Sequence, residues 1–229
     1  MMTPIHRPSP NSGPRKGDIV DMLVIHYTGM PTAEAALARL CDPAAEVSAH
    51  YLIDEDGSVY SLVPEDQRAW HAGASVWRGH ADINSRSVGI ELVNPGHEFG
   101  YRPFPDAQIS VLMVLATSVV FRHGIPARNV VGHSDVAPTR KQDPGEYFPW
   151  ERLKSAGIGL WPFEDDETGP VPPLEDSLRM LAEYGYDVAD PKAAIAAFQR
   201  HFRPSRVDGA MDGETAGRLA RLLAAVGGG

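Results

Sequence analysis

The chain has 229 residues, of which 43% are hydrophobic, and a formal net charge of −9. This length suffices for one sizeable core, or for one domain followed by a smaller one. The acidic balance argues against a nucleic-acid partner, because binding to phosphate backbones depends on clustered Lys and Arg. The single cysteine, Cys41, excludes an internal disulfide framework, and no apolar run is long enough to span a membrane.

Strand and helix patterns alternate through the first 160 residues, which indicates an α/β domain with a mixed central sheet and helices on its faces. Residues 1–17 are rich in Pro, Ser and Gly, and we expect an irregular arm there. In the domain at 18–160 we expect strands at 18–28, 50–53, 59–63, 87–93 and 129–131, and helices at 32–40, 106–123 and 150–156. Helix 106–123 has the clearest apolar periodicity, and Gly124 supplies its stop.

The composition changes after residue 157. Four consecutive acidic residues at 164–167 and several prolines indicate a linker, which we place at 161–173. Residues 174–229 predict a small all-α C-terminal domain with helices at 174–184, 191–202 and 213–226, the second opened by Asp190 as N-cap and Pro191. The linker predicts that the two parts fold independently.

The segment at 129–150 carries the strongest chemical pattern. His133 follows a short apolar strand, and Asp143 lies on the loop after it. Neutral imidazole and carboxylate both bind zinc well, and a third ligand could come from His26 at the end of the strand at 19–25. The alternative is that His133 and Asp143 are loop residues that satisfy local hydrogen bonds.

Glu91 interrupts the apolar strand 87–93. A carboxylate in such a run is rarely buried without a partner or a chemical role. The alternative is that the strand is half exposed and that Glu91 faces water.

Five segments resemble one family, in the family's order: VIHYTG at 24–29, SAHYLID at 48–54, AWHAGASVWRG at 69–79, SVGIELVN at 87–94 and VVGHSDVAPTRKQDPGEYFPW at 130–150. The family is that of the zinc-dependent N-acetylmuramoyl-L-alanine amidases, whose fold is shared with bacteriophage T7 lysozyme and the peptidoglycan-recognition proteins. The tail, with AAFQRHFRP at 196–204 and VDGAMDGET at 207–215, resembles the three-helix peptidoglycan-binding domain.

Carried over onto the matching positions, the resemblance implies that His26, His133 and Asp143 are zinc ligands and that Glu91 and Lys141 are the catalytic pair. Three protein ligands are typical of a catalytic zinc with one open position. In that role Glu91 would accept and return a proton, while Lys141 and the metal would stabilise the developing oxyanion.

The implied reaction is hydrolysis of the amide between N-acetylmuramic acid, or its anhydro form, and L-alanine, in peptidoglycan or in muropeptides during cell-wall turnover and recycling. Two alternatives are a non-catalytic peptidoglycan-binding or sensing protein and a zinc peptidase of different specificity. The presence of Glu91 and Lys141 beside three intact ligands favours the amidase over the binding protein. The oligomeric state is left open.

Weaker indications concern the substrate. Candidate contacts are His50, His71, Trp77, Asn84 and Arg86. His50 begins a strand, so the alternative to substrate contact is a structural or supporting role for this residue. Ser134 lies next to His133, but no Gly-x-Ser-x-Gly elbow supports a serine hydrolase.

Residues 1–17 contain four prolines and lack the apolar core of an export signal. We therefore expect a cytoplasmic enzyme that acts on imported muropeptides. The alternative is a periplasmic or outer-membrane-associated enzyme, which is where a wall-binding tail would meet intact peptidoglycan and which a misassigned start codon could conceal.

Overall fold

The computed structural model describes residues 3–17, 19–164 and 167–227. Asp18, where we place the start of the first domain, and part of the linker, Asp165 and Asp166, lie outside the described residues. The strands are β1 (Ile5–His6), β2 (Ser12–Pro14), β3 (Met22–Tyr27), β4 (Tyr51–Ile53), β5 (Val59–Ser61), β6 (Gln67–Ala69), β7 (Val76–Trp77), β8 (His80–Ala81), β9 (Ser87–Leu92) and β10 (Val130–Gly132). The helices are α1 (Ala33–Leu40), α2 (Ile83–Arg86), α3 (Gly96–Phe99), α4 (Asp106–His123), α5 (His133–Val136), α6 (Trp150–Lys154), α7 (Leu174–Tyr184), α8 (Pro191–Phe202) and α9 (Gly213–Gly227), with 3₁₀ turns at Pro43–Ala45 and Ala127–Asn129.

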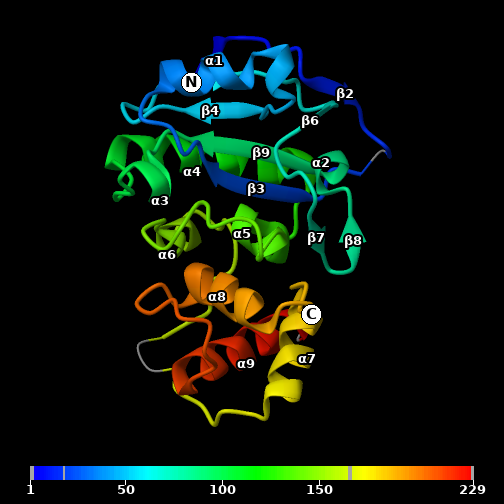
Figure 1. Cartoon of the computed structure of the whole chain (residues 1–229), viewed down its shortest axis with the longest axis vertical. Helices are drawn as coiled ribbons and strands as arrows, with labels where there is room; N and C mark the ends of the chain where they lie inside the picture. Colours follow the sequence, from blue (N-terminus) through cyan, green and yellow to red (C-terminus); the bar gives the residue numbers. More distant parts are fainter. Residues whose placement is uncertain (1–2, 18, 165–166, 228–229) are drawn as a thin grey trace.

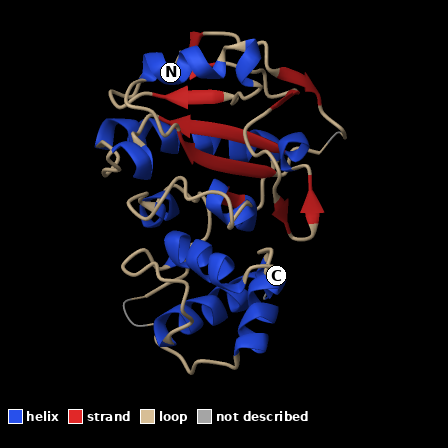
Figure 2. Cartoon of the chain, in the orientation of Figure 1, coloured by secondary structure: helices blue, strands red, loops and turns tan. Residues whose placement is uncertain are grey.

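The expected mixed sheet is confirmed. Its strand order is β1-β5-β4-β9-β3-β10, with β4 and β5 antiparallel and the other neighbours parallel. Figure 1 shows α1 above the sheet, α4 behind it, and α5 and α6 between the sheet and the tail. Figure 2 shows that strands are confined to the upper part of the molecule, while the tail consists of helices and loops. No helix in the described ranges has both the length and the apolar character needed to cross a membrane.

Alternation along the central strands gives the sheet two different faces. Leu23 and Ile25 of β3 pack with Ile109 and Leu112 of α4 in an apolar core. The other face of β3 carries His26, which is paired in register with Glu91 on the neighbouring strand β9. Because partners in parallel register lie on the same face, the sheet itself brings these two polar side chains together.

Helix α4 has the predicted bounds and ends at Gly124, whose φ of +64° is the left-handed conformation that favours glycine. Its inner face is buried against the sheet, whereas Phe121 is 90% exposed on the outer face. Packing in the core therefore accounts for the apolar residues on the inner face of the helix, and not for those on its outer face.

The N-terminal arm is more ordered than expected. β1 pairs in parallel with β5 at the edge of the sheet, and β2 pairs with β6. Asn11 Nδ2 donates to the carbonyl oxygens of Asp42 and Val47, each at 2.8 Å. The expectation of an irregular arm is wrong here because these partners are distant in sequence and leave no local periodicity.

The tail helices match the predicted segments, but the structure does not support independent folding. One apolar core joins both parts of the chain. Its members from the first part include Met22, Val24, Trp77, Ile83, Val131 and Val136, and those from the tail include Leu181, Tyr186, Phe198, Phe202, Leu219 and Leu222. The proline-rich and acidic composition of a linker contains no information about the apolar surfaces of the parts that it joins.

We predict that Phe198→Ala destabilises both parts together. Phe198 is fully buried in the shared core, and such a truncation costs about 3–5 kcal/mol of unfolding free energy. Three tryptophans, Trp77, Trp150 and Trp161, pack against rings of the tail, so their fluorescence follows the contact between the two parts. Urea unfolding is measured by this fluorescence and by far-UV circular dichroism, and we expect both signals to shift together.

The matched control is Phe121→Ala, which removes the same side chain from an exposed site and should change the unfolding free energy by less than about 0.5 kcal/mol. Two separate transitions, of which Phe198→Ala shifts only one, would show that the two parts fold independently.

Candidate metal centre

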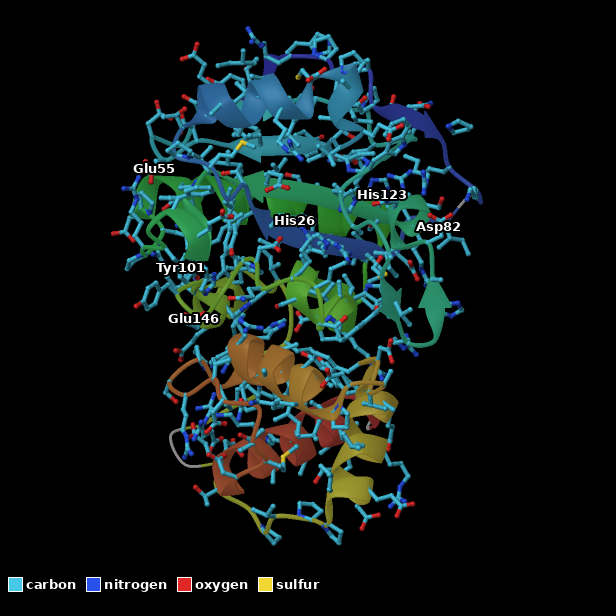
Figure 3. All side chains as sticks on the ribbon, viewed as in Figure 1. His26, Glu55, Asp82, Tyr101, His123 and Glu146 are labelled. Carbon is cyan, nitrogen blue, oxygen red and sulfur yellow. The ribbon has the colours of Figure 1, made fainter. Side chains whose placement is uncertain are left out.

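Three predicted ligands converge at the ends of the central strands. His26 lies near the end of β3, His133 begins α5 directly after β10, and Asp143 lies on the loop that follows. All three residues are buried, at 1%, 3% and 5% exposure. The Nδ1 atoms of the two histidines are 2.9 Å apart, and Asp143 Oδ2 is 3.1 Å from that of His26 and 3.0 Å from that of His133. Figure 3 labels His26 at the centre of the molecule, on β3.

The tautomer of His133 follows from its second nitrogen. Nε2 of His133 lies 3.1 Å from the carbonyl oxygen of Ala72, which can only accept. Nε2 therefore carries the proton and donates. Nδ1 of the neutral ring is left with a lone pair that faces His26 and Asp143.

A longer chain of hydrogen bonds sets the tautomer of His26. The Ser87 hydroxyl donates to the carbonyl oxygen of Ile83 at 2.7 Å, so Ser87 Oγ accepts from His71 Nε2 at 3.2 Å. His71 Nδ1 then accepts from His26 Nε2 at 3.0 Å. His26 Nδ1, like that of His133, presents a lone pair to the centre of the site.

Charge agrees with this assignment. Burial, followed by the proximity of His133, lowers the pKa of His26 to about 4, which makes it neutral at pH 7. Burial works against the charge of Asp143, but the neighbouring His133 and His26 hold the pKa of that carboxyl well below its usual range. A neutral His26 and an anionic Asp143 thus face each other beside His133, a charge state that suits a bound cation.

This arrangement fits a divalent metal ion. The three residues form a group of His and Asp ligand atoms within 4.8 Å of one another. Tetrahedral zinc with bonds of about 2.0–2.1 Å would separate its ligand atoms by roughly 3.3 Å, close to the spacing here. Second hydrogen bonds from ligating histidines, such as those to Ala72 and His71, are typical of metal sites.

The site opens into a cavity of about 550 Å³ that is lined by His133 and Asp143 together with Glu91 and Lys141. Glu91 is half-buried. Its Oε2 is buried and has no hydrogen-bond partner in the described part of the chain. Burial, followed by repulsion from Asp143, raises the pKa of Glu91 to about 8, while Lys141 opposes the shift. The alternative that Glu91 faces bulk water is wrong.

Of the five candidate substrate contacts, the cavity lining includes His71 alone. His50 is fully buried, and its Nδ1 accepts from the backbone N–H of Gly89 at 2.9 Å. Asn84 Oδ1 accepts from the backbone N–H groups of His71 and Ala72. His50 and Asn84 therefore shape the surroundings of the site without lining its cavity.

Trp77 and Arg86 have structural partners as well. The Trp77 indole N–H donates to Asn129 Oδ1 at 3.3 Å, and Arg86 forms an ion pair with Asp21. Neither residue belongs to the lining of the cavity. Aromatic and basic residues in a loop resemble a binding surface in sequence, and only their distant partners reveal that they hold the fold together.

Sequence reasoning also missed two histidines. His97 lines the cavity, where its ring contacts Tyr27 Oη at 2.8 Å and Glu146 Oε2 at 3.1 Å. His201 of α8 is buried against Asp135. Neither has a local motif that could have pointed to it.

Comparison with known proteins gives the family of this chain. A model of the Amidase_2 family, described as N-acetylmuramoyl-L-alanine amidase, matches residues 15–146. N-acetylmuramoyl-L-alanine amidase AmiD of Escherichia coli is 40% identical over 89% of this chain and 82% of its own length. The 1,6-anhydro-N-acetylmuramyl-L-alanine amidase AmpD of Escherichia coli is 35% identical over 64% of this chain and 88% of its own.

Solved structures extend the likeness to the tail. A structure of AmiD from E. coli, in complex with the substrate anhydro-N-acetylmuramic acid-L-Ala-D-gamma-Glu-L-Lys, superposes with a TM-score of 0.84 at 38% identity, over 93% of this chain and 92% of that one. AmpDh3 from Pseudomonas aeruginosa, in complex with an anhydromuramic pentapeptide, gives 0.83 at 37% identity, over 92% and 93%. With the family model spanning more than half of the chain and the AmiD likeness spanning most of it, this chain belongs to the N-acetylmuramoyl-L-alanine amidases of the Amidase_2 family.

Proposed function

We propose that this amidase hydrolyses the amide between N-acetylmuramic acid, or its anhydro form, and L-alanine, with zinc held by His26, His133 and Asp143. The observation that carries the proposal is the convergence of three lone-pair donors on one point beside the unpartnered carboxylate of Glu91. The solved complexes of AmiD and AmpDh3 contain anhydromuramic peptides, which supports muropeptides as the substrate class.

When bound, zinc supplies a Lewis acid that polarises the amide carbonyl and makes water acidic enough to react near neutral pH. Glu91 faces the same cavity from the neighbouring strand. In its ionised form, which a zinc ion nearby would favour, Glu91 would take a proton from water and return it to the leaving amine. Lys141 lines the cavity and provides positive charge for the developing oxyanion.

The test is incubation of the protein with purified murein and, separately, with an anhydro-muropeptide, followed by mass analysis of the products. We expect an intact sugar and a peptide that begins with a free L-alanine amine. Cleavage at a peptide bond within the stem would favour the zinc peptidase instead.

Replacement of His26, His133 or Asp143 by Ala should remove metal and activity together, because each supplies one of the three converging ligand atoms. Elemental analysis of the purified variants measures the metal, and His80→Ala, at an exposed histidine, is the control that should retain it. A metal-free variant with full activity would exclude this site.

Glu91→Gln should retain the metal and lower kcat by about 10²–10⁴-fold, the usual range for loss of a general acid–base group. Elemental analysis and steady-state kinetics on the same preparation separate the two effects. A variant with near-native kcat would show that Glu91 carries no proton.

The same substitution has a signature in chelator-treated protein. Folding raises the pKa of Glu91 from 4.5 to about 8. Between these pH values the folded chain therefore holds a proton that the unfolded chain has lost. Glu91 therefore makes stability fall as pH rises through this window, by up to ~1.4 kcal/mol per pH unit. The stability difference between Glu91→Gln and the unaltered protein, measured by urea unfolding, should grow in favour of the variant from pH 5 to 8.

His71→Ala should weaken zinc binding by about 10–100-fold, because it removes the acceptor that fixes the tautomer of His26. His71→Asn keeps a side-chain oxygen as acceptor and should recover part of the affinity. Competition with a chromogenic chelator gives the dissociation constants. Equal affinities for the unaltered protein and His71→Ala would assign His71 to substrate contact alone.

Location stays a prediction. The cytoplasm is the expected compartment, and the periplasm or outer membrane is the alternative. Fractionation of the native host with its endogenous start site would decide between them.

A further inference from the structure

Asp135 is a fully buried carboxylate two residues after His133. The proposed reaction does not use it. Its Oδ2 accepts from the backbone N–H of Gly132 at 2.7 Å and lies 2.6 Å from His201 Nδ1. Its Oδ1 accepts from the hydroxyl of Tyr186 at 2.7 Å. Two of these three partners belong to the tail.

Burying a carboxylate is costly unless hydrogen bonds compensate it. Asp135 has one hydrogen bond with Gly132 nearby in the sequence and two with residues of the tail. The contact between the tail and the first domain is therefore more specific than an apolar one, since both tail groups must be aligned with this one side chain.

Helix α8 contacts the same segment, residues 132–150, at two further points; we call this segment the metal loop. The ring of His201 stacks on Trp150, with centroids 3.7 Å apart and planes at 18°. The neighbouring Arg200 pairs with Glu146 across 3.9 Å. Figure 1 shows α8 directly beneath α5 and α6, and Figure 3 shows Glu146 just above the end of this helix.

Close contacts connect Asp135 with the ligands through the metal loop. The backbone N–H of Ser134 donates to the carbonyl oxygen of Asp143 at 2.8 Å. The start of the loop also lies close to its later part, because a Cβ on Gly132 would lie 2.6 Å from Pro144 Cδ. We therefore expect a shift of Asp135 to be felt at His133 or Asp143.

We propose that Asp135, held by Tyr186 and His201, positions the metal loop, so that the helical tail is a working part of the metal site. The inference rests on the proposed metal site, and it assigns the tail a role besides attachment to the cell wall. Tyr186 and His201 act as positioning residues through Asp135 and touch neither metal nor substrate.

The test uses the full chain and compares Tyr186→Phe with Tyr184→Phe. Both tyrosines are buried in the shared core, but in the described part of the chain the hydroxyl of Tyr184 makes no hydrogen bond, whereas that of Tyr186 binds Asp135. We expect Tyr186→Phe to weaken zinc binding about threefold to tenfold, the factor that corresponds to one net hydrogen bond, and Tyr184→Phe to leave it within about twofold. Chelator competition, well below the melting temperature, measures both.

A second variant, His201→Phe, keeps a ring to stack on Trp150 and removes the donor to Asp135. It should weaken zinc binding in the same way and lower kcat more than it changes KM. If this variant does not fold, the comparison of Tyr186→Phe with Tyr184→Phe still tests the inference.

Melting temperatures of the metal-free proteins separate positioning from stability alone. A lower melting temperature for Tyr186→Phe with unchanged zinc affinity would overturn the inference and leave the amidase reaction untouched. Normal zinc affinity in the unaltered protein without turnover of muropeptides would overturn the proposed function and not this inference.

Discussion

The central constraint of the structure is the convergence of three ligand atoms, Nδ1 of His26, Nδ1 of His133 and Oδ2 of Asp143. They lie about 3 Å apart in a buried site, a spacing that suits a bound metal cation. The ring nitrogens that point away make this possible, because the carbonyl of Ala72 and the acceptor atom of His71 keep the protons on the far side of each ring.

The support for this centre comes from two directions. On the sheet side, Gly89 leaves room for the ring of His71, since a Cβ at that position would lie 2.5 Å from His71 Cγ. Ser87, two residues earlier on the same strand, accepts from that ring. Strand β9 thus carries Glu91, the proposed proton carrier, and also the residues that position His71, the hydrogen-bond partner of His26.

On the opposite side, the metal loop lies against α8. The likeness to AmiD and AmpDh3 extends through the tail, over more than nine tenths of this chain, whereas the AmpD likeness covers 64%. In a chain with the tail, the back of the metal loop is an interior surface and not a solvent-exposed one. The tail can therefore influence the reaction without contacting substrate.

Local pattern was enough for much of the fold. Helix α4 has the predicted bounds because its apolar period and the glycine that ends it are both contained in the sequence of the helix. The ligand set, Glu91 and Lys141 were recognisable because strand ends and motifs mark them. In the structure His133, Asp143, Glu91 and Lys141 line one cavity, and His26 lies in one group with the two other ligands. Tertiary structure decided which surrounding residues matter. Trp77 and Arg86 resemble ligand contacts in sequence yet hold distant parts of the chain, while His71, Asp135 and His201 gain their roles from partners 45 to 66 residues away. Periodicity and spacing describe neighbours along the chain, and hydrogen bonds across such separations exist only once the sheet and the tail have packed together.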